Sequence, residues 1–202
     1  MQRSAEFGPL TIAFDERVLE PRRWTVLQSE WAAELSAHLP SGPILELCAG
    51  AGQIGLLTAR LTGRPLIQVE SCPIAAAFAT RNAHHAGIHD YEMRVTSITS
   101  ATFAGESFPL IVADPPYLPS SDITQFPDDP AHAIDGGPDG MRFLRECIAV
   151  AATHLSDGGA MLLQVRGQAQ ADLVRAAAVR AHDDERAVAL ITRPEIEQLV
   201  IG

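Results

Sequence analysis

The chain has 202 residues, a length typical of one α/β domain, and we expect a single domain over 1–202. No apolar run reaches the roughly 18 residues of a membrane helix and the first residues lack the apolar core of a signal peptide, so we expect a cytoplasmic protein without membrane segments. The formal net charge is −10 and all 15 basic residues are arginine, which disfavours general attraction to nucleic acid phosphates.

Alternating strand and helix patterns predict a mostly parallel sheet covered by helices. The chain starts with a predicted β-hairpin, whose turn falls at Asp15 and Glu16, and with a helix that packs on the domain, both within 1–40. The last two strands are joined by too few residues for a crossover helix, so the last strand of the seven-stranded sheet is expected to be antiparallel. In chain order the predicted strands are 10–14 and 17–20 of the hairpin and 43–47, 65–69, 91–95, 109–113, 160–165, 187–192 and 198–201 of the sheet, and the predicted helices are 24–39, 53–61, 73–86, 139–155 and 169–181.

Residues 44–55, ILELCAGAGQIG, are typical of a strand, a tight glycine turn and the start of a helix. The same glycine spacing occurs in dinucleotide-binding proteins, so an NAD-type oxidoreductase is one alternative. Glu46 favours a different ligand, because a carboxylate pointing into the crevice repels a pyrophosphate and attracts the ammonium and sulfonium of S-adenosylmethionine. The other role open to Glu46 is that of a helix-capping surface acid. Glu70, at the end of the next strand, is placed for ribose hydroxyls with either ligand.

Asp114-Pro115-Pro116-Tyr117 follows the fourth strand of the sheet and opens a long loop, 114–138, of a length that is usually functional or disordered. The nitrogen of an amide or aromatic amine is a poor nucleophile because its lone pair is delocalised. Hydrogen bonds from its NH₂ group to the Asp114 carboxylate and the Pro115 carbonyl would hold it and turn the lone pair toward a methyl group. Tyr117 can stack on the planar group and face the sulfonium. The pattern predicts in-line methyl transfer that depends on positioning, whereas without the glycine turn it would indicate only a proline-rich turn.

The three cysteines, Cys48, Cys72 and Cys147, are widely spaced. None has CxxC spacing, so we expect neither a disulfide framework nor a zinc site. Reduced cysteines pack as small apolar side chains, and that is the role predicted for all three. The acidic residues of the long loop suit turns and helix caps, so no metal site is predicted.

These motifs together resemble the class I S-adenosylmethionine-dependent methyltransferases. The closest resemblance is to the HemK/PrmC group, which methylates the side-chain amide of glutamine in the Gly-Gly-Gln motif of translation release factors. It runs from about Phe7 to the C-terminus. FGPLTIAFDERVLEPRRWT is similar to the family's hairpin and its VLIPRPET sequence, LELCAGAGQIGL to its cofactor loop, ADPPYL to its NPPY motif, and AIDGGPDGMRFL to its ALDGGxDGL sequence.

The resemblance implies a Rossmann-like fold, S-adenosylmethionine as the cofactor, and two sets of site residues. The acceptor nitrogen would be held by Asp114, Pro115, Pro116 and Tyr117. The cofactor would be bound by Glu46, Leu47, Cys48, Ala49, Gly50, Gly52, Ile54, Glu70, Ser71, Ser97 and Asp114.

The chain differs from the family pattern at four points. Asp114 stands where the family has Asn, as it does in many adenine amino-methyltransferases and ribosomal RNA guanine methyltransferases. Ser97 stands where the family has an acid that contacts adenine. Arg23 and Trp24 replace a proline and an acid of the PRPET sequence. We also expect the chain to lack the N-terminal helical domain with which bacterial members engage release factors.

The leading hypothesis is therefore N-methylation of a glutamine amide in a release-factor-like protein partner. Methylation of an adenine or guanine amino group in RNA or DNA is an alternative that Asp114 favours and the acidic charge disfavours. A small-molecule methyltransferase and a non-catalytic cofactor-binding protein are further alternatives. Neither the acceptor nor the oligomeric state follows from the sequence.

Overall fold

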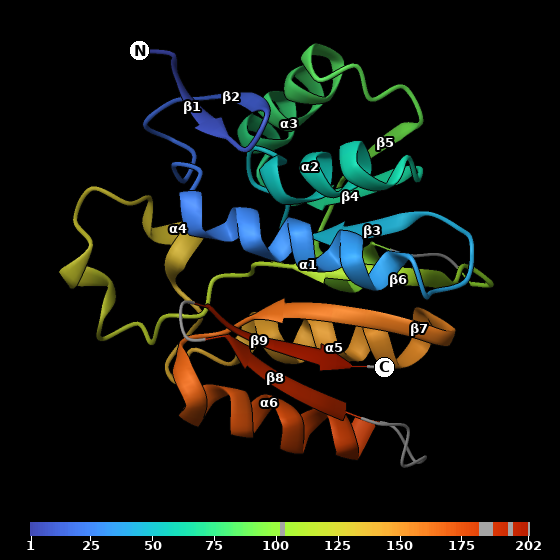
Figure 1. Cartoon of the computed structure of the whole chain (residues 1–202). Coiled ribbons are helices and arrows are strands. Elements are labelled where there is room, and N and C mark those ends of the chain that lie inside the picture. Colours follow the sequence, from blue (N-terminus) through green and yellow to red (C-terminus); the bar gives the residue numbers. More distant parts are fainter. Residues whose placement is uncertain (102–103, 182–187, 194–195, 202) are drawn as a thin grey trace.

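The computed structural model describes residues 1–101, 104–181, 188–193 and 196–201, and its main feature is a sheet between two layers of helices (Figure 1). The sheet strands are β3 (Ile44–Leu47), β4 (Leu66–Glu70), β5 (Tyr91–Val95), β6 (Phe108–Ala113), β7 (Leu155–Gln164), β8 (Val188–Arg193) and β9 (Ile196–Ile201). Their spatial order is β5-β4-β3-β6-β7-β9-β8. Neighbours from β5 to β7 are parallel, and β9 pairs antiparallel with both β7 and β8. The predicted α/β fold, with its mostly parallel seven-stranded sheet and antiparallel last strand, is confirmed.

Helices cover both faces of this sheet. They are α1 (Val26–Ser36), α2 (Gln53–Thr62), α3 (Pro73–His85), α4 (Ala131–Ile134), α5 (Arg142–His154) and α6 (Gly167–Ala181), with short 3-10 turns η1 (Arg23–Thr25), η2 (Ile98–Ser100) and η3 (Ile123–Gln125). Successive side chains of a strand point to opposite faces, so Ile44 packs with α1, α2 and α3, whereas Leu45 packs with α5 and α6. The central strand β6 is buried at every position, as its apolar sequence predicts.

The strand order reverses beside β3. From β3 the chain crosses through α2 to β4 and then β5 on one side, whereas β6 and β7 lie on the other side. In open α/β sheets, ligands bind at the carboxyl ends of the strands near such a reversal. The carboxyl ends of β3, β4 and β6 are therefore the place at which this fold positions a site.

The N-terminal hairpin lies one strand earlier than predicted. Strand β1 (Arg3–Phe7) pairs antiparallel with β2 (Leu10–Phe14), and Gly8, at a φ of +56°, makes the turn before Pro9. The predicted strand 17–20 is wrong, because Asp15 ends β2 in a turn of its own. Its carbonyl accepts a hydrogen bond from the Val18 backbone, and its carboxylate accepts one from the Arg17 backbone at 3.0 Å.

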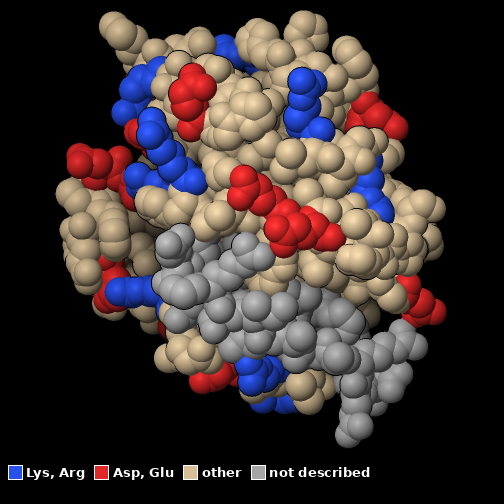
Figure 2. All heavy atoms as spheres, viewed as in Figure 1, with Lys and Arg blue, Asp and Glu red and all other residues tan. Residues whose placement is uncertain are grey.

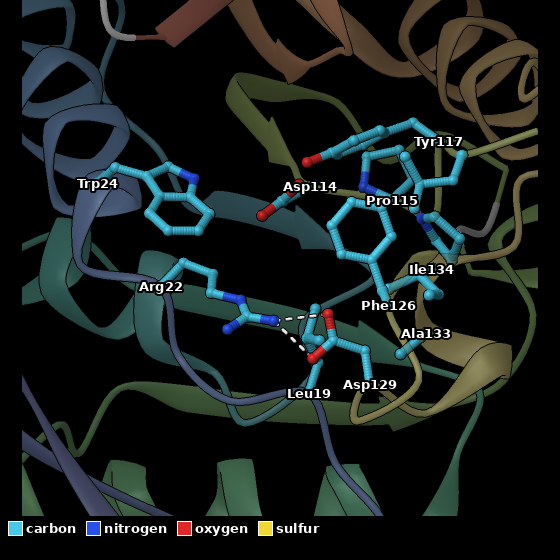
Figure 3. A pocket seen from close by; sticks show the side chains of 12 residues that line it. Leu19, Arg22, Trp24, Asp114, Pro115, Tyr117, Phe126, Asp129, Ala133 and Ile134 are labelled. Carbon is cyan, nitrogen blue, oxygen red and sulfur yellow. Dashed lines mark hydrogen bonds and ion pairs between the residues drawn. The ribbon is translucent and has the colours of Figure 1, made fainter. Parts of the chain in front are cut away.

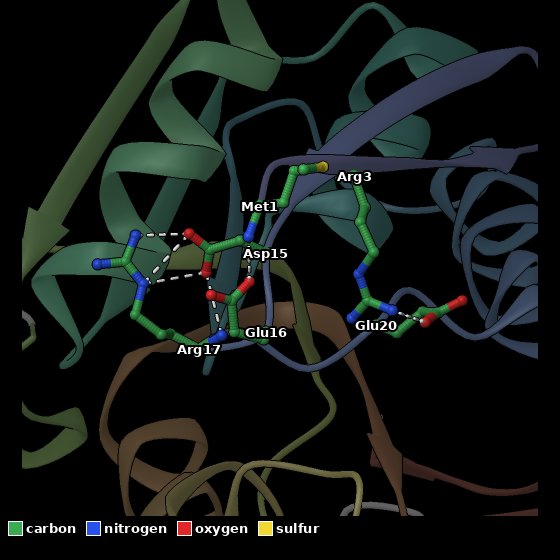
Figure 4. A network of polar contacts seen from close by, with 6 residues as sticks. All are labelled: Met1, Arg3, Asp15, Glu16, Arg17 and Glu20. Carbon is green, nitrogen blue, oxygen red and sulfur yellow. Dashed lines mark hydrogen bonds and ion pairs between the residues drawn. The ribbon is translucent and has the colours of Figure 1, made fainter.

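Ion pairs join the start of the chain to the segment that follows β2 and also lie within that segment (Figure 4). The pairs are Met1 with Glu16 at 2.8 Å, Arg3 with Glu20 at 3.4 Å and Arg17 with Asp15 at 2.5 Å. Apart from the Asp15 carboxylate these groups are largely exposed, and exposed ion pairs add little to stability. Their main effect is to fix the path of the chain between β2 and η1.

Asn82 of α3 joins the hairpin to the glycine turn that follows β3. Its side-chain oxygen accepts a hydrogen bond from the Ala13 backbone at 2.9 Å. Its side-chain NH₂ group donates to the carbonyls of Ala13, at 3.0 Å, and Ala51, at 2.9 Å. Because Asn82 is buried, these bonds are costly to break, and the hairpin is fixed to the turn.

The predicted helix 24–39 begins later than expected, because Trp24 lies in η1 and only Val26–Ser36 is α-helical. Trp24 is 51% exposed instead of packing in the core. The predicted loop 114–138 contains η3 and α4. Within the described residues, no helix combines the length and apolarity needed to cross a membrane.

Candidate active site

A cavity of about 390 Å³ lies over the carboxyl ends of β3 and β4 and the loops that follow β5 and β6. Eight of the residues predicted to bind the cofactor line it: Cys48, Ala49, Gly50, Ile54, Glu70, Ser71, Ser97 and Asp114. We call this cavity the cofactor cavity. Its other lining residues are Val18, Leu19, Gln53, Val69, Cys72, Ala75, Thr96, Ile98, Thr99, Pro116, His132, Ala133, Arg142, Phe143 and Glu146.

The glycines of the turn after β3 have separate roles. Gly50, at a φ of +57°, has open space where a Cβ would lie, so its backbone faces the cavity without obstruction. At Gly52 a Cβ would lie 3.0 Å from the Gln68 side chain, and at Gly55 it would lie 2.3 Å from the Glu46 carboxylate. Gly50 thus permits a ligand to approach, whereas Gly52 and Gly55 permit the turn to pack on the sheet.

Glu46 does not point into the cofactor cavity, contrary to the orientation expected from the sequence. It is 2% exposed, and its carboxylate accepts hydrogen bonds from the Gly55 backbone at 3.0 Å and from the Gln68 side chain. Burial raises its pKa to about 8. Gln68 also donates to the Gly52 carbonyl at 3.0 Å, so the two side chains fix the glycine turn from behind. Neither Leu47, which is fully buried, nor Gly52 lines the cavity.

Glu70, unlike Glu46, lines the cofactor cavity. One carboxylate oxygen accepts a hydrogen bond from the Gly50 backbone at 2.8 Å, and the other accepts one from the Cys72 backbone at 2.7 Å. These bonds join the turn after β3 to the turn after β4. The remaining lone pairs of a partly exposed carboxylate suit hydroxyl donors such as those of a ribose.

Cys48 is the one described non-glycine residue with a positive φ, +58°. A side chain in this conformation costs about 1–2 kcal/mol, so this position is strained. The neighbouring Cys147 thiol and burial raise the pKa of the Cys48 thiol, which keeps it protonated and a weak nucleophile. The described cysteines are free, as predicted, and no group of metal ligands occurs among the described residues.

A second cavity, of about 270 Å³, adjoins the first, and we call it the acceptor cavity (Figure 3). All four residues predicted to hold the acceptor nitrogen line it: Asp114, Pro115, Pro116 and Tyr117. Four residues line both cavities: Leu19, Asp114, Pro116 and Ala133. The remaining wall of the acceptor cavity is formed by Arg22, Trp24, Leu118, Phe126, Asp129 and Ile134.

Asp114 lies where the two cavities meet, and Figure 3 shows its side chain between Trp24 on one side and Tyr117 and Phe126 on the other. Burial raises the pKa of Asp114 to about 7 and that of Tyr117 above its usual value. Tyr117 lines only the acceptor cavity. The strand end before Asp114 is held by Gln28 of α1, whose side chain donates to the Ala113 carbonyl at 3.1 Å.

The glycine-rich sequence 136–140 packs directly beneath this segment. A Cβ at Gly136 would lie 2.8 Å from the Pro116 carbonyl oxygen, and one at Gly140 would lie 2.4 Å from the Tyr117 carbonyl oxygen. Gln170 of α6 donates to the same Tyr117 carbonyl at 3.0 Å. The sequence AIDGGPDGMRFL carries the family resemblance at these glycines, whereas no motif marks Gln170.

Arg22 and Asp129 close one side of the acceptor cavity (Figure 3). The two carboxylate oxygens of Asp129 accept hydrogen bonds from Nη2 of Arg22 at 2.5 and 2.6 Å. The Arg22 guanidinium also lies 5.7 Å from the Trp24 ring centre. Trp24, Phe126 and Asp129 are site residues that the sequence does not predict, because no motif marks them and Trp24 is about 100 residues from the other two.

Comparisons with known proteins give one consistent family. No family model matches the chain. It is 37% identical over 163 residues to a release factor glutamine methyltransferase of Mycolicibacterium smegmatis, which covers 77% of this chain and 57% of that protein. It is 32% identical over 178 residues to the protein of the same name from Geobacter sulfurreducens, which covers 84% of this chain and 60% of that protein. The chain therefore spans less than two thirds of these relatives.

Solved structures give the same fold at lower identity. A ribosomal protein L11 methylase from Lactobacillus delbrueckii subsp. bulgaricus has a TM-score of 0.65 at 15% identity, covering 92% of this chain and 81% of that one. A methyltransferase from Pyrococcus furiosus has a TM-score of 0.69 at 17% identity, covering 96% and 89%. Taken together, the sequence similarity and the shared fold identify the chain as a HemK/PrmC-like member of the class I S-adenosylmethionine-dependent methyltransferases.

Proposed function

We propose that this chain transfers the methyl group of S-adenosylmethionine to the side-chain amide nitrogen of a glutamine, in a protein acceptor of the release-factor type. The observation that carries the proposal is the junction of the two cavities at Asp114 and Pro116. A methyl donor in one cavity and an amide in the other would face each other across this junction. The relatives named release factor glutamine methyltransferase support the choice of acceptor.

The cofactor cavity suits S-adenosylmethionine better than a dinucleotide. Glu70 offers a carboxylate to ribose hydroxyls, and the open backbone at Gly50 leaves room for the amino-acid portion. The acid at the other end, Asp114, would lie near the sulfonium and would attract it, whereas it would repel a pyrophosphate. When bound, the cofactor supplies an electrophilic methyl group on a positively charged sulfur.

The acceptor cavity supplies positioning and a hydrogen-bond acceptor. The ionised Asp114 carboxylate and the Pro115 carbonyl would accept the two N–H bonds of the amide, which localises its lone pair and directs it toward the methyl carbon. The sulfur of the cofactor would leave as a neutral thioether when the amide nitrogen accepts the methyl group, and Asp114 or water would take the proton that this nitrogen loses. Tyr117 and Trp24 supply flat walls that suit a planar group.

Charge around the acceptor cavity favours a protein over a nucleic acid. Among the described residues that line it, Arg22 is the one cation, and Asp129 neutralises it. On the face shown in Figure 2, arginines are interspersed with acids instead of forming a basic stripe. Binding of nucleic acid depends on unpaired basic groups that contact phosphate, and this cavity offers none of them.

A second candidate, methylation of a nucleobase amino group, has one observation in its favour. Trp24, Phe126 and Tyr117 give the acceptor cavity aromatic walls, on which a base could stack, and Asp114 can accept from its amino group. The first candidate predicts that the methyl group is transferred to a protein, and the second predicts that it is transferred to a nucleic acid.

The test supplies radiolabelled S-adenosylmethionine with either a release factor or ribosomal RNA. We expect label in the release factor, lost when its acceptor glutamine is replaced by alanine. Asp114→Ala should abolish transfer while S-adenosylhomocysteine still binds, and Asp128→Ala, an exposed acid of the same loop outside both cavities, should retain transfer. Label in RNA alone would favour the second candidate, and equal transfer by Asp114→Ala would refute the role of that carboxylate.

A further inference from the structure

The far end of the cofactor cavity, away from Asp114, has one wall made by the loop after β5. This loop contributes Thr96, Ser97, Ile98 and Thr99 to the cavity, and these lining residues include hydroxyl groups but no acid. The hydroxyls of Ser97 and Thr99 lie 3.2 Å apart and hydrogen-bond to each other. The lining residues of this loop therefore provide no charged hydrogen-bond acceptor for a ligand.

The other wall at this end comes from α5, which packs directly against η2 of the same loop. Phe143 and Glu146 lie one turn apart on α5 and both line the cavity. The Glu146 side chain is 26% exposed, and its carboxylate lies 3.6 Å from Nε of Arg142. The Arg142 guanidinium in turn lies 4.8 Å from the centre of the Phe143 ring. The three side chains form one cluster on this wall.

The three acids that line the cofactor cavity occupy different places. Glu70 is held by two backbone amides beside the glycine turn. Asp114 lies at the junction with the acceptor cavity. Only Glu146, among the described acids of this cavity, lies on α5, which packs against η2 of the loop after β5. A carboxylate beside an aromatic ring suits a flat heterocycle that carries an NH₂ donor.

We propose that Glu146 accepts a hydrogen bond from the exocyclic amino group of the cofactor's adenine, with Phe143 against the face of the ring. The inference rests on the proposed function, because it needs S-adenosylmethionine in this cavity. Hydrogen bonds to charged groups contribute about 1.5–3 kcal/mol, which corresponds to an affinity change of roughly 10- to 100-fold.

The test compares two ligands by calorimetry: S-adenosylhomocysteine, and S-inosylhomocysteine, which has a 6-oxo group instead of the 6-amino group. The unaltered chain should bind the adenosyl ligand at least about 10-fold more tightly. Glu146→Gln should reduce that ratio to near one, because an amide can either accept from an amino group or donate to an oxo group. Glu30→Gln, the same change at an exposed position of α1, should keep the ratio.

A second variant tests whether the preference comes from a carboxylate at this end of the cavity. Adding Ser97→Asp to Glu146→Gln places an acid on the loop after β5, and it should restore a preference for the adenosyl ligand. If Glu146→Gln binds both ligands with the original ratio, the role of Glu146 is refuted while the proposed function stands. If the unaltered chain binds neither ligand, the cofactor assignment itself is overturned, and the inference fails with it.

Discussion

The Glu70 carboxylate accepts a hydrogen bond from the Gly50 backbone at 2.8 Å, which joins the end of β4 to the glycine turn beside the cofactor cavity. Replacing Glu70 with alanine removes this acceptor and the one used by Cys72. We expect affinity for S-adenosylhomocysteine to fall about 10- to 100-fold, because both the ligand and the turn lose a charged partner. Calorimetry would measure the change, with Glu30→Ala as the control. A dissociation constant within about two-fold of the original would contradict this role.

The rate of methyl transfer should rise with pH through about 7, because burial raises the pKa of Asp114 to about 7. Below that pH the carboxyl is protonated and is a weaker acceptor for the amide N–H, and above it the carboxylate is ionised. Asp114→Asn is neutral at every pH, so it should transfer more slowly but lose this transition. Single-turnover rates across the range would show both effects. An unchanged transition in the variant would assign it to another group.

The ion pair between Arg22 and Asp129 should control the affinity for the acceptor, because it forms one wall of the acceptor cavity and none of the cofactor cavity. Arg22→Gln or Asp129→Asn should raise the KM for the acceptor several-fold and leave the Kd of S-adenosylhomocysteine unchanged. The double variant should be little worse than either single variant, since the two groups act as a unit. The exposed pair Arg145–Asp139, outside both cavities, provides the control through Arg145→Gln.

Cys48→Val should destabilise the fold more than Cys147→Val does. Position 48 has a φ of +58°, which a β-branched side chain tolerates poorly, whereas Cys147 lies within α5. Both thiols pack in the same core, so the loss of the thiol is matched between the two variants. We expect a difference of about 1–2 kcal/mol in the free energy of unfolding, measured by urea denaturation. Equal unfolding midpoints would show that a β-branched side chain tolerates the backbone conformation at position 48.

Features that depend on neighbouring residues could be predicted from the sequence. The glycine turn between β3 and α2 and the four residues 114–117 have local signatures, and the structure brings both to the carboxyl ends of adjacent strands. The hairpin shows the limit of local patterns. The sequence predicts the strand at 10–14 correctly, but it places the partner strand at 17–20, whereas the Gly8–Pro9 turn pairs β2 with Arg3–Phe7.

Features that depend on distant residues could not be predicted. Arg22 and Asp129 are 107 residues apart, and their pairing follows only from the way η1 and the loop before α4 meet. Glu46 was expected to attract the cofactor, but it is buried against Gly55 and Gln68, because no pattern shows toward which side of a turn a carboxylate points. Trp24 fits a helical repeat, and its exposure follows only from the late start of α1.

The three hydrogen bonds of Asn82 have a consequence for experiments on ligand binding. They attach the Ala13 backbone in β2 and the Ala51 carbonyl in the glycine turn to a single side chain. A ligand that rigidifies the turn would therefore slow hydrogen–deuterium exchange at the Ala13 amide, although that amide does not line the cavity. Hydrogen–deuterium exchange in β2 could therefore report whether the cofactor cavity is occupied, although this strand does not contact the ligand.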